Sequence, residues 1–177
     1  MELKEKNMTQ QYFDEKYIRR ANALAQKAKN KGEDPFGALL VKDNEIVFES
    51  HDGCIEFCDP TFHAEKRLIS EYCRLHKIIS LEGYTLYSST EPCSMCSGAI
   101  HWSKISRVVF GVRQEKLNEK SGGIKKFTAK QILHQCGKPI EVVGPILEEE
   151  CLQTFSGYKF RMKKERIKEH LDNKREL

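Results

Sequence analysis

Apolar side chains return at helical spacing in the first part of the chain. Phe13, Tyr17, Ala21 and Leu24 lie three or four positions apart, with charged and polar residues between them. This period places them on one face of an amphipathic helix. The pattern therefore predicts a helix over about residues 11–30, which Gly32 would end.

Shorter apolar runs after this helix are typical of β-strands. Two of them, at residues 36–41 and 46–49, flank a polar turn and predict a hairpin. Three more, at 84–88, 107–112 and 140–143, alternate with helical patterns that begin near Thr61, at Pro92 and near Thr128. Thr61 is the expected cap of its helix. Residues 116–123 are polar and contain glycine, so we expect a loop there.

The order of these elements predicts the fold class. Strands and helices alternate after an initial hairpin, which favours an α/β domain with helices on both faces of a mixed sheet. We expect a three-layer α/β/α sandwich around a five-stranded mixed sheet. A single domain would span residues 1–177, with its core at about 11–160 and a charged carboxyl-terminal helix over about 147–177.

Composition limits the class of protein. A chain of 177 residues can bury a core without disulfides, and its seven cysteines are odd in number. The first residues, MELKEK, contain no apolar stretch of a signal peptide, and no run reaches the ~18 apolar residues of a membrane span. We therefore expect a cytoplasmic protein. The balance of 30 basic to 26 acidic residues gives +4, too little to indicate nucleic acid by itself.

Two short motifs carry metal-ligand residues. His63 stands two residues before Glu65, and the C-x-x-C pair Cys93 and Cys96 begins 30 positions after the histidine. One histidine and two cysteines supply three ligands of a tetrahedral zinc and leave the fourth position for water. The spacing leaves room for one helix and one strand, which can bring both motifs together. We predict one Zn²⁺ per chain at this site.

Each half of the pattern also has a simpler interpretation. A C-x-x-C pair is typical of a redox pair or of half a structural zinc site, although the chain has no second C-x-x-C to complete one. Glu65 could be an ordinary acid in the first turn of a helix, where negative charge is favoured. Cys54 and Cys58 lie close to His63 and leave open a redox pair or ligands of a second metal.

A zinc site with an adjacent carboxylate indicates hydrolysis. The metal lowers the pKa of its water enough to give hydroxide at neutral pH. Glu65 would take the proton of that water and pass it to a leaving amino group. The attacked carbon would belong to an amidine-like ring, as in cytosine, adenine or guanine. The predicted reaction is a hydrolytic deamination that leaves a carbonyl and releases ammonia.

The order H-x-E…P-C-x-x-C is the signature of zinc deaminases, and the sequence around it resembles the cytidine deaminase superfamily. The similarity covers about residues 11–160 and includes the stretches 34–38 (DPFGA), 59–61 (DPT), 85–87 (TLY), 98–100 (GAI) and 107–111 (RVVFG). The chain is similar to the branch that holds guanine deaminases and bacterial tRNA adenosine deaminases. This resemblance implies the fold named above and a homodimer in which a neighbour partly closes each active site.

The resemblance also implies residues that contact the substrate. Phe36 and the residue at position 52 would touch the base, and Trp102 lies in a stretch, 100–103, that is more similar to guanine deaminases. Residues 146–151 and 160–164 look instead like the tRNA enzymes. Three positions depart from the family pattern: Asp52 replaces an asparagine, Gln114 replaces an aspartate of the tRNA enzymes, and Phe62 replaces a small residue.

The change at position 52 alters hydrogen bonding. An ionised aspartate only accepts hydrogen bonds, whereas asparagine also donates them. Asp52 should therefore favour a ligand that presents a ring N–H, an amino group or a hydroxyl. The alternative is that Asp52 only caps the turn that follows it.

Three functions are consistent with these motifs. The first is a zinc-dependent deaminase of a guanine-type purine base or nucleoside, and the second is a tRNA adenosine deaminase that modifies the wobble position. The third is a non-catalytic zinc-containing binding module, which the retention of Glu65 and all three ligands disfavours. In the basic tail, Glu165 and Glu169 interrupt the positive residues, which favours a salt-bridged helix over an RNA-binding face. The tail also has no aromatic residue after Phe160 on which a base could stack.

Overall fold

A five-stranded mixed sheet forms the centre of the computed structural model, which describes residues 2–124, 127–137 and 140–175, with the side chains of the first helix from Gln10 onward. The strand order is β2-β1-β3-β4-β5. Strand β1 runs antiparallel to β2 and β3, whereas β3, β4 and β5 are parallel. The strands are β1 (Gly37–Lys42), β2 (Glu45–His51), β3 (Thr85–Thr90), β4 (Arg107–Val112) and β5 (Glu141–Val143).

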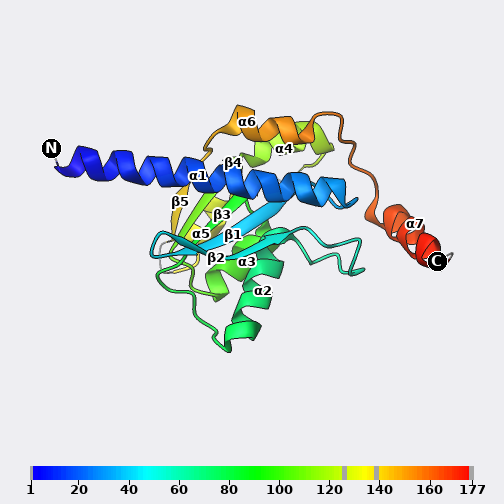
Figure 1. The fold of residues 1–177 in the computed structure, drawn as a ribbon, viewed down its shortest axis with the longest axis horizontal. Helices are drawn as coiled ribbons and strands as arrows, with labels where there is room; N and C mark the ends of the chain where they lie inside the picture. Colours follow the sequence, from blue (N-terminus) through cyan, green and yellow to red (C-terminus); the bar gives the residue numbers. More distant parts are fainter. Residues whose placement is uncertain (1, 125–126, 138–139, 176–177) are drawn as a thin grey trace.

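Helices cover both faces of this sheet (Figure 1). One face packs against α1 (Glu2–Asn30), α4 (Gln114–Ser121), α6 (Glu148–Leu152) and the short 3-10 helix η1 (Gln153–Phe155). The other face packs against α2 (Ala64–His76), α3 (Ser94–Trp102) and α5 (Ala129–His134). The last helix, α7 (Lys163–Arg175), stands beside the carboxyl end of α1. The predicted three-layer α/β/α sandwich is confirmed.

The strands divide their side chains between two cores. Leu40 and Leu86 belong to the core under α2 and α3, and their neighbours Leu39 and Tyr87 belong to the core under α1. Successive side chains of a strand point to opposite faces, and here both faces are covered by helices. This is why the central strands read as continuous apolar runs instead of alternating ones.

An ion pair fixes the first helix to the sheet. The two Asp14 carboxylate oxygens accept hydrogen bonds from Arg107 Nη1 and Nη2 at 2.8 and 2.7 Å, and Tyr87 donates its hydroxyl to the same carboxylate at 2.7 Å. Burial alone raises the pKa of Asp14, but the hydrogen bonds from Arg107 and Tyr87 outweigh it and hold the pKa below its usual value. Asp14 therefore stays ionised inside the fold.

The loop predicted at residues 116–123 is wrong, because most of it lies in α4. Only Gln114 and Leu117 of this helix are buried, so the sequence has too few apolar positions to show a helical period. Its first turn is stabilised from elsewhere in the chain: Glu91 Oε2 accepts the Gln114 N–H at 2.9 Å. Gly122, with φ of 67°, follows the helix in a left-handed conformation.

The predicted cap of α2 is also wrong. The helix begins at Ala64, and His63 occupies the N-cap position. Thr61 lies in the preceding turn, where Asp59 Oδ1 accepts its N–H at 2.8 Å and its hydroxyl at 2.6 Å. Phe62 and His63 thus lie between this turn and the first residue of the helix, Ala64.

The carboxyl-terminal helix predicted over 147–177 is interrupted. Residues 156–162 separate η1 from α7, and Gly157 adopts a left-handed φ of 67° that ends helical structure. Positions 176 and 177 lie outside the described residues. Within the described ranges, no helix combines the length and the apolar character needed to cross a membrane.

Candidate active site

The two sequence motifs meet at the amino-terminal ends of two helices. His63 is the N-cap of α2, and Cys93 is the N-cap of α3; both have extended backbones, with ψ of 155° and 173°. Cys96 lies in the first turn of α3 and is fully buried. Because α2 and α3 pack on the same face of the sheet, the fold holds all three side chains at one place.

The distances between these side chains fit a tetrahedral metal ion. The Sγ atoms of Cys93 and Cys96 lie 3.6 and 3.8 Å from His63 Nδ1, and the three donor atoms all lie within 4.8 Å of one another. With Zn–S and Zn–N bonds of about 2.3 and 2.0 Å, two tetrahedral ligands stand about 3.6 Å apart. The donor set and its spacing therefore suit zinc, with one position left open.

The protein also prepares a thiolate. A hydrogen bond from Cys96 overcomes the effect of burial and, with His63, lowers the pKa of Cys93 to about 3. The same hydrogen bond and burial raise the pKa of Cys96 well above its usual value. One sulfur of the pair is thus already in the form that binds metal.

Glu65 points to the same place from the first turn of α2. Its Oε1 accepts the Ser88 hydroxyl at 3.1 Å, and its Oε2 lies 3.5 Å from the Cys96 thiol. Burial, with the negative charge of Cys93 added, raises the pKa of Glu65. A carboxyl group whose pKa is raised in this way holds a proton more readily than an exposed one, which suits a group that transfers protons.

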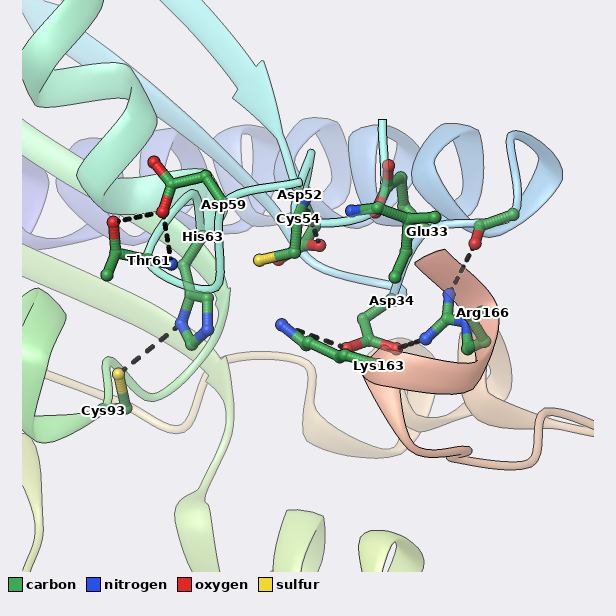
Figure 2. Close-up of polar contacts among 12 residues, drawn as sticks. Glu33, Asp34, Asp52, Cys54, Asp59, Thr61, His63, Cys93, Lys163 and Arg166 are labelled. Carbon is green, nitrogen blue, oxygen red and sulfur yellow. Dashed lines mark hydrogen bonds and ion pairs between the residues drawn. The ribbon is translucent and has the colours of Figure 1, made fainter. Parts of the chain in front are cut away.

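Asp52 reaches the site from the end of β2. It is fully buried, and its Oδ1 accepts the Cys54 N–H at 3.2 Å. Donor atoms of Asp52, Cys54 and His63 also lie within 4.8 Å of one another, and Figure 2 shows the His63 ring between Cys93 and this pair. Burial raises the pKa of Asp52 to about 6, with Lys163 and His63 opposing the shift. Asp52 makes the predicted turn contact and also faces the metal-ligand residues.

The other two predicted substrate contacts lie differently. The Phe36 carbonyl accepts the Asp52 N–H at 3.0 Å, but its ring packs against the rings of Phe155 and Phe160 at centroid distances of 6.1 and 6.2 Å. Trp102 is 80% exposed and stands at the opposite end of α3 from Cys93. Within one chain, the structure brings Asp52 close to the ligand residue His63, whereas the side chain of Trp102 lies away from the ligands.

A comparison of the sequence with models of known protein families identifies the family of this chain. The family model of the cytidine and deoxycytidylate deaminase zinc-binding region matches residues 11–112, which is more than half of the chain. The chain belongs to the cytidine deaminase superfamily. It is therefore a member of a family of deaminases that share this mixed sheet and this zinc-binding motif.

Individual relatives act on different substrates. A probable cytosine deaminase of Schizosaccharomyces pombe is 40% identical over 147 residues, which cover 80% of this chain and 90% of that protein. The tRNA-specific adenosine deaminase of Bacillus subtilis is 37% identical over 160 residues, covering 89% and 97%. The solved guanine deaminase of Bacillus subtilis superposes with a TM-score of 0.58 at 28% identity, covering 84% of this chain and 96% of that one.

The cysteines near the ligands of this deaminase do not form a pair. Cys54 is buried, whereas Cys58 is exposed and directs its Sγ to the Ile55 carbonyl at 3.8 Å. Both thiols are free. In the described part of the chain, Cys58 belongs to neither group of metal-ligand side chains, so the alternative of a joint Cys54–Cys58 metal site has no support.

Sequence reasoning missed several polar residues at this site. Ser88 could have been found, because it shares a strand face with Leu86, two positions before it, and that face packs under α2. Lys163 and Asp34 could not have been linked, since they lie far apart in the chain and meet only through the path of residues 156–162. Lys163 Nζ lies 3.5 Å from Asp34 Oδ2 (Figure 2).

Proposed function

We propose that this protein is a zinc-dependent hydrolytic deaminase of a small nucleobase or nucleoside, with guanine-type purines as the first candidates. It would replace a ring amino group by a carbonyl and release ammonia. The observation that carries the proposal is the position of Glu65, a buried carboxyl group 3.5 Å from Cys96 in the ligand set of His63, Cys93 and Cys96. A non-catalytic binding module would not need a proton carrier there.

The residues have separate tasks in this reaction. His63, Cys93 and Cys96 would hold zinc, which supplies the activation of water for attack at neutral pH. Glu65 would accept the proton that the attacking water loses and donate it to the departing amino group. The Ser88 hydroxyl fixes one carboxylate oxygen, so the other stays directed at the ligands. Burial of Glu65 keeps bulk water from taking the proton instead.

The charge pairing of the carboxyl-terminal helix favours a small substrate. Arg161 pairs with Glu169, and Arg166 pairs with Asp34, so acids of the same chain neutralise both guanidinium groups. Basic side chains paired in this way leave less positive charge free to bind the phosphates of an anticodon loop. A tRNA adenosine deaminase is the second candidate, supported by 37% identity to that bacterial enzyme along 89% of this chain. Cytosine is also a candidate substrate, because the probable cytosine deaminase of Schizosaccharomyces pombe is 40% identical to this chain.

Ammonia release from a panel of substrates tests the proposal. The panel contains guanine, guanosine, adenosine, cytosine, a pterin-like base and an anticodon stem-loop RNA. We expect turnover of a small base or nucleoside by the zinc-loaded protein and the loss of nearly all of that turnover in Glu65→Gln. Turnover of the stem-loop alone would establish the tRNA function instead, and no ammonia from any member would refute a deaminase of these substrates.

We further propose a homodimer, as the family resemblance implies, and a cytoplasmic location, as the composition favours. Exposed apolar side chains support the dimer: Trp102 and Ile79, 80% and 90% exposed, line a groove between α2 and α3. A partner on this groove would bring Trp102 into an interface, where it could act on the neighbouring site. A role in purine metabolism would follow from a guanine-type substrate.

A further inference from the structure

Asp34 anchors the carboxyl-terminal segment beside the active site. Its carboxylate pairs with Arg166 and with Lys163, both on α7, and accepts the Tyr158 hydroxyl at 2.6 Å. Arg166 is also held by the Gly32 carbonyl at the end of α1. Asp34 and Arg166 are buried, so this contact fixes the helix in one place.

The residue before Asp34 fixes the loop that carries Asp52. The two carboxylate oxygens of Glu33 accept the backbone N–H groups of Ile55 and Glu56 at 2.9 and 2.6 Å. Glu33 is buried, and the loop it holds begins with Asp52. Two consecutive acids therefore position both α7 and the loop after β2, and the relative placement of Lys163 and Asp52 is set by the fold.

Lys163 points from α7 toward the metal-ligand residues. Figure 2 shows its Nζ directed to the space beside His63, Asp52 and Cys54. Its side chain is 29% exposed, and it shares the inward side of this highly charged helix with the buried Arg166. Burial alone would lower the pKa of Lys163, but the carboxylate of Asp52 and the contact with Cys54 raise it. The ammonium is thus held charged at the edge of the site.

We propose that Lys163 is a specificity-determining residue of the deaminase site, where its ammonium donates to a substrate oxygen while the neighbouring Asp52 accepts from a substrate N–H. This inference rests on the proposed function. Lysine can only donate and an ionised aspartate can only accept. Together they present a donor beside an acceptor on one wall of the site. The matching ligand edge is a ring N–H next to a carbonyl.

Pairs of bases that differ in one carbonyl and the ring N–H beside it test this role. Guanine is compared with 2-aminopurine, and cytosine with 4-aminopyrimidine; in each pair the second base keeps the amino group and lacks both the carbonyl and the adjacent N–H. In Lys163→Met we expect kcat/KM for the carbonyl-bearing base to fall about 10- to 100-fold, mostly through KM, because a hydrogen bond to a charged group is lost. The base without the carbonyl should change by less than about threefold.

Companion variants separate this role from a structural one. Lys164→Met removes the neighbouring exposed ammonium and should leave both substrates unchanged. Lys163→Arg keeps a charged donor and should restore part of the discrimination. In the double variant Asp52→Asn/Lys163→Met, the fold-loss in kcat/KM should be smaller than the product of the two single fold-losses. Each single variant leaves the other charged residue without its partner, and the double variant does not have this cost. An equal loss for both bases of a pair would overturn the proposal.

Equilibrium binding separates failure of this proposal from failure of the proposed function. Binding of guanine and of cytosine to the zinc-loaded protein is measured by calorimetry in the parent and in Lys163→Met. If the parent releases no ammonia but binds a base about tenfold more tightly than the variant, the deaminase function fails and the Lys163 contact stands. Binding that is absent from the parent, or the same in both proteins, would overturn the contact.

Discussion

Glu65 and Asp52 are two buried carboxyl groups with different contacts in the site. Glu65 is held by a serine hydroxyl and faces Cys96, and we propose that it moves a proton. Asp52 is held by the Cys54 N–H and lies near the Lys163 ammonium, and we propose that it accepts a hydrogen bond. The two acids differ in environment and not in the type of functional group, so the environment is the basis of both proposals.

Glu65→Gln should keep the fold and the metal and lose nearly all turnover. The amide preserves size and the contact with Ser88 but has no basic oxygen to carry a proton, so we expect kcat to fall about 10²- to 10⁴-fold. Steady-state ammonia release and the zinc content of the same sample measure this. Glu71→Gln, on the same helix but paired with Arg67, is the matched control. Activity of Glu65→Gln within a few-fold of the parent would show that another group carries the proton.

Cys96→Ser should lose most of the bound zinc. Its sulfur lies 3.8 Å from His63 Nδ1 in the ligand set, and a serine hydroxyl is a poor substitute for a thiolate. Elemental analysis of the purified parent should give close to one zinc per chain. Cys136→Ser should keep the parent's content, since that thiol contacts the Ile132 carbonyl instead. Equal zinc in parent and Cys96→Ser would place the metal elsewhere.

Single residues were predictable where the chemistry is local in sequence. His63, Glu65, Cys93 and Cys96 form two compact motifs whose spacing is fixed by one helix and one strand, and the structure brings their side chains together. Lys163 could not be identified in this way, because it lies among charged residues whose sequence is typical of a solvent-exposed helix. Only the three-dimensional path of the tail shows that this lysine faces inward.

Among the elements, α1 depends on the Asp14–Arg107 ion pair. The pKa of Asp14 is lowered in the folded protein, so its contribution to stability is fully present above the ordinary carboxyl value of about 3.8 and is lost as pH falls through the lower folded value. Asp14→Asn should lower the free energy of unfolding by about 3 kcal/mol at pH 7, a cost typical of breaking a buried pair. The difference between parent and variant should shrink below about pH 4.

Urea unfolding at several pH values measures that difference. Glu169→Gln is the control, because its carboxylate pairs with Arg161 on the exposed side of α7 and should matter little. A stability difference between parent and Asp14→Asn that stays constant from pH 7 to pH 3 would contradict the lowered pKa.

Elements were predictable where apolar period or alternation was strong. The first helix, the hairpin and β4 follow directly from their patterns, since burial on one or both faces dictates those residues. Helix α4 was missed because a distant carboxylate, that of Glu91, stabilises its start, and only Leu117 and Gln114 are buried. The break in the tail depends on Gly157, whose left-handed backbone an apolar pattern does not reveal.

At the scale of the whole molecule, we propose that a second chain binds in the groove between α2 and α3. Ile79→Glu places a charge among its apolar side chains and should convert a dimer to monomers, because an unpaired charge in an interface is costly. Sedimentation velocity measures the change. Leu75→Glu, at an exposed position of α2 that is not among the groove-lining residues, should leave the dimer intact. A parent that sediments as a monomer would refute the homodimer.

The positions of His63 and Cys93 as helix caps determine whether folding of the chain depends on the metal. Small zinc domains fold only when metal orders their ligands. Here two helices packed on a large apolar core already order both ligand segments. Chelation should therefore remove zinc with little change in the far-ultraviolet circular dichroism, and added zinc should restore activity. Loss of helical signal on chelation would show the opposite. We then expect that zinc can bind after the chain has folded, dissociate when zinc is scarce and bind again without the chain unfolding.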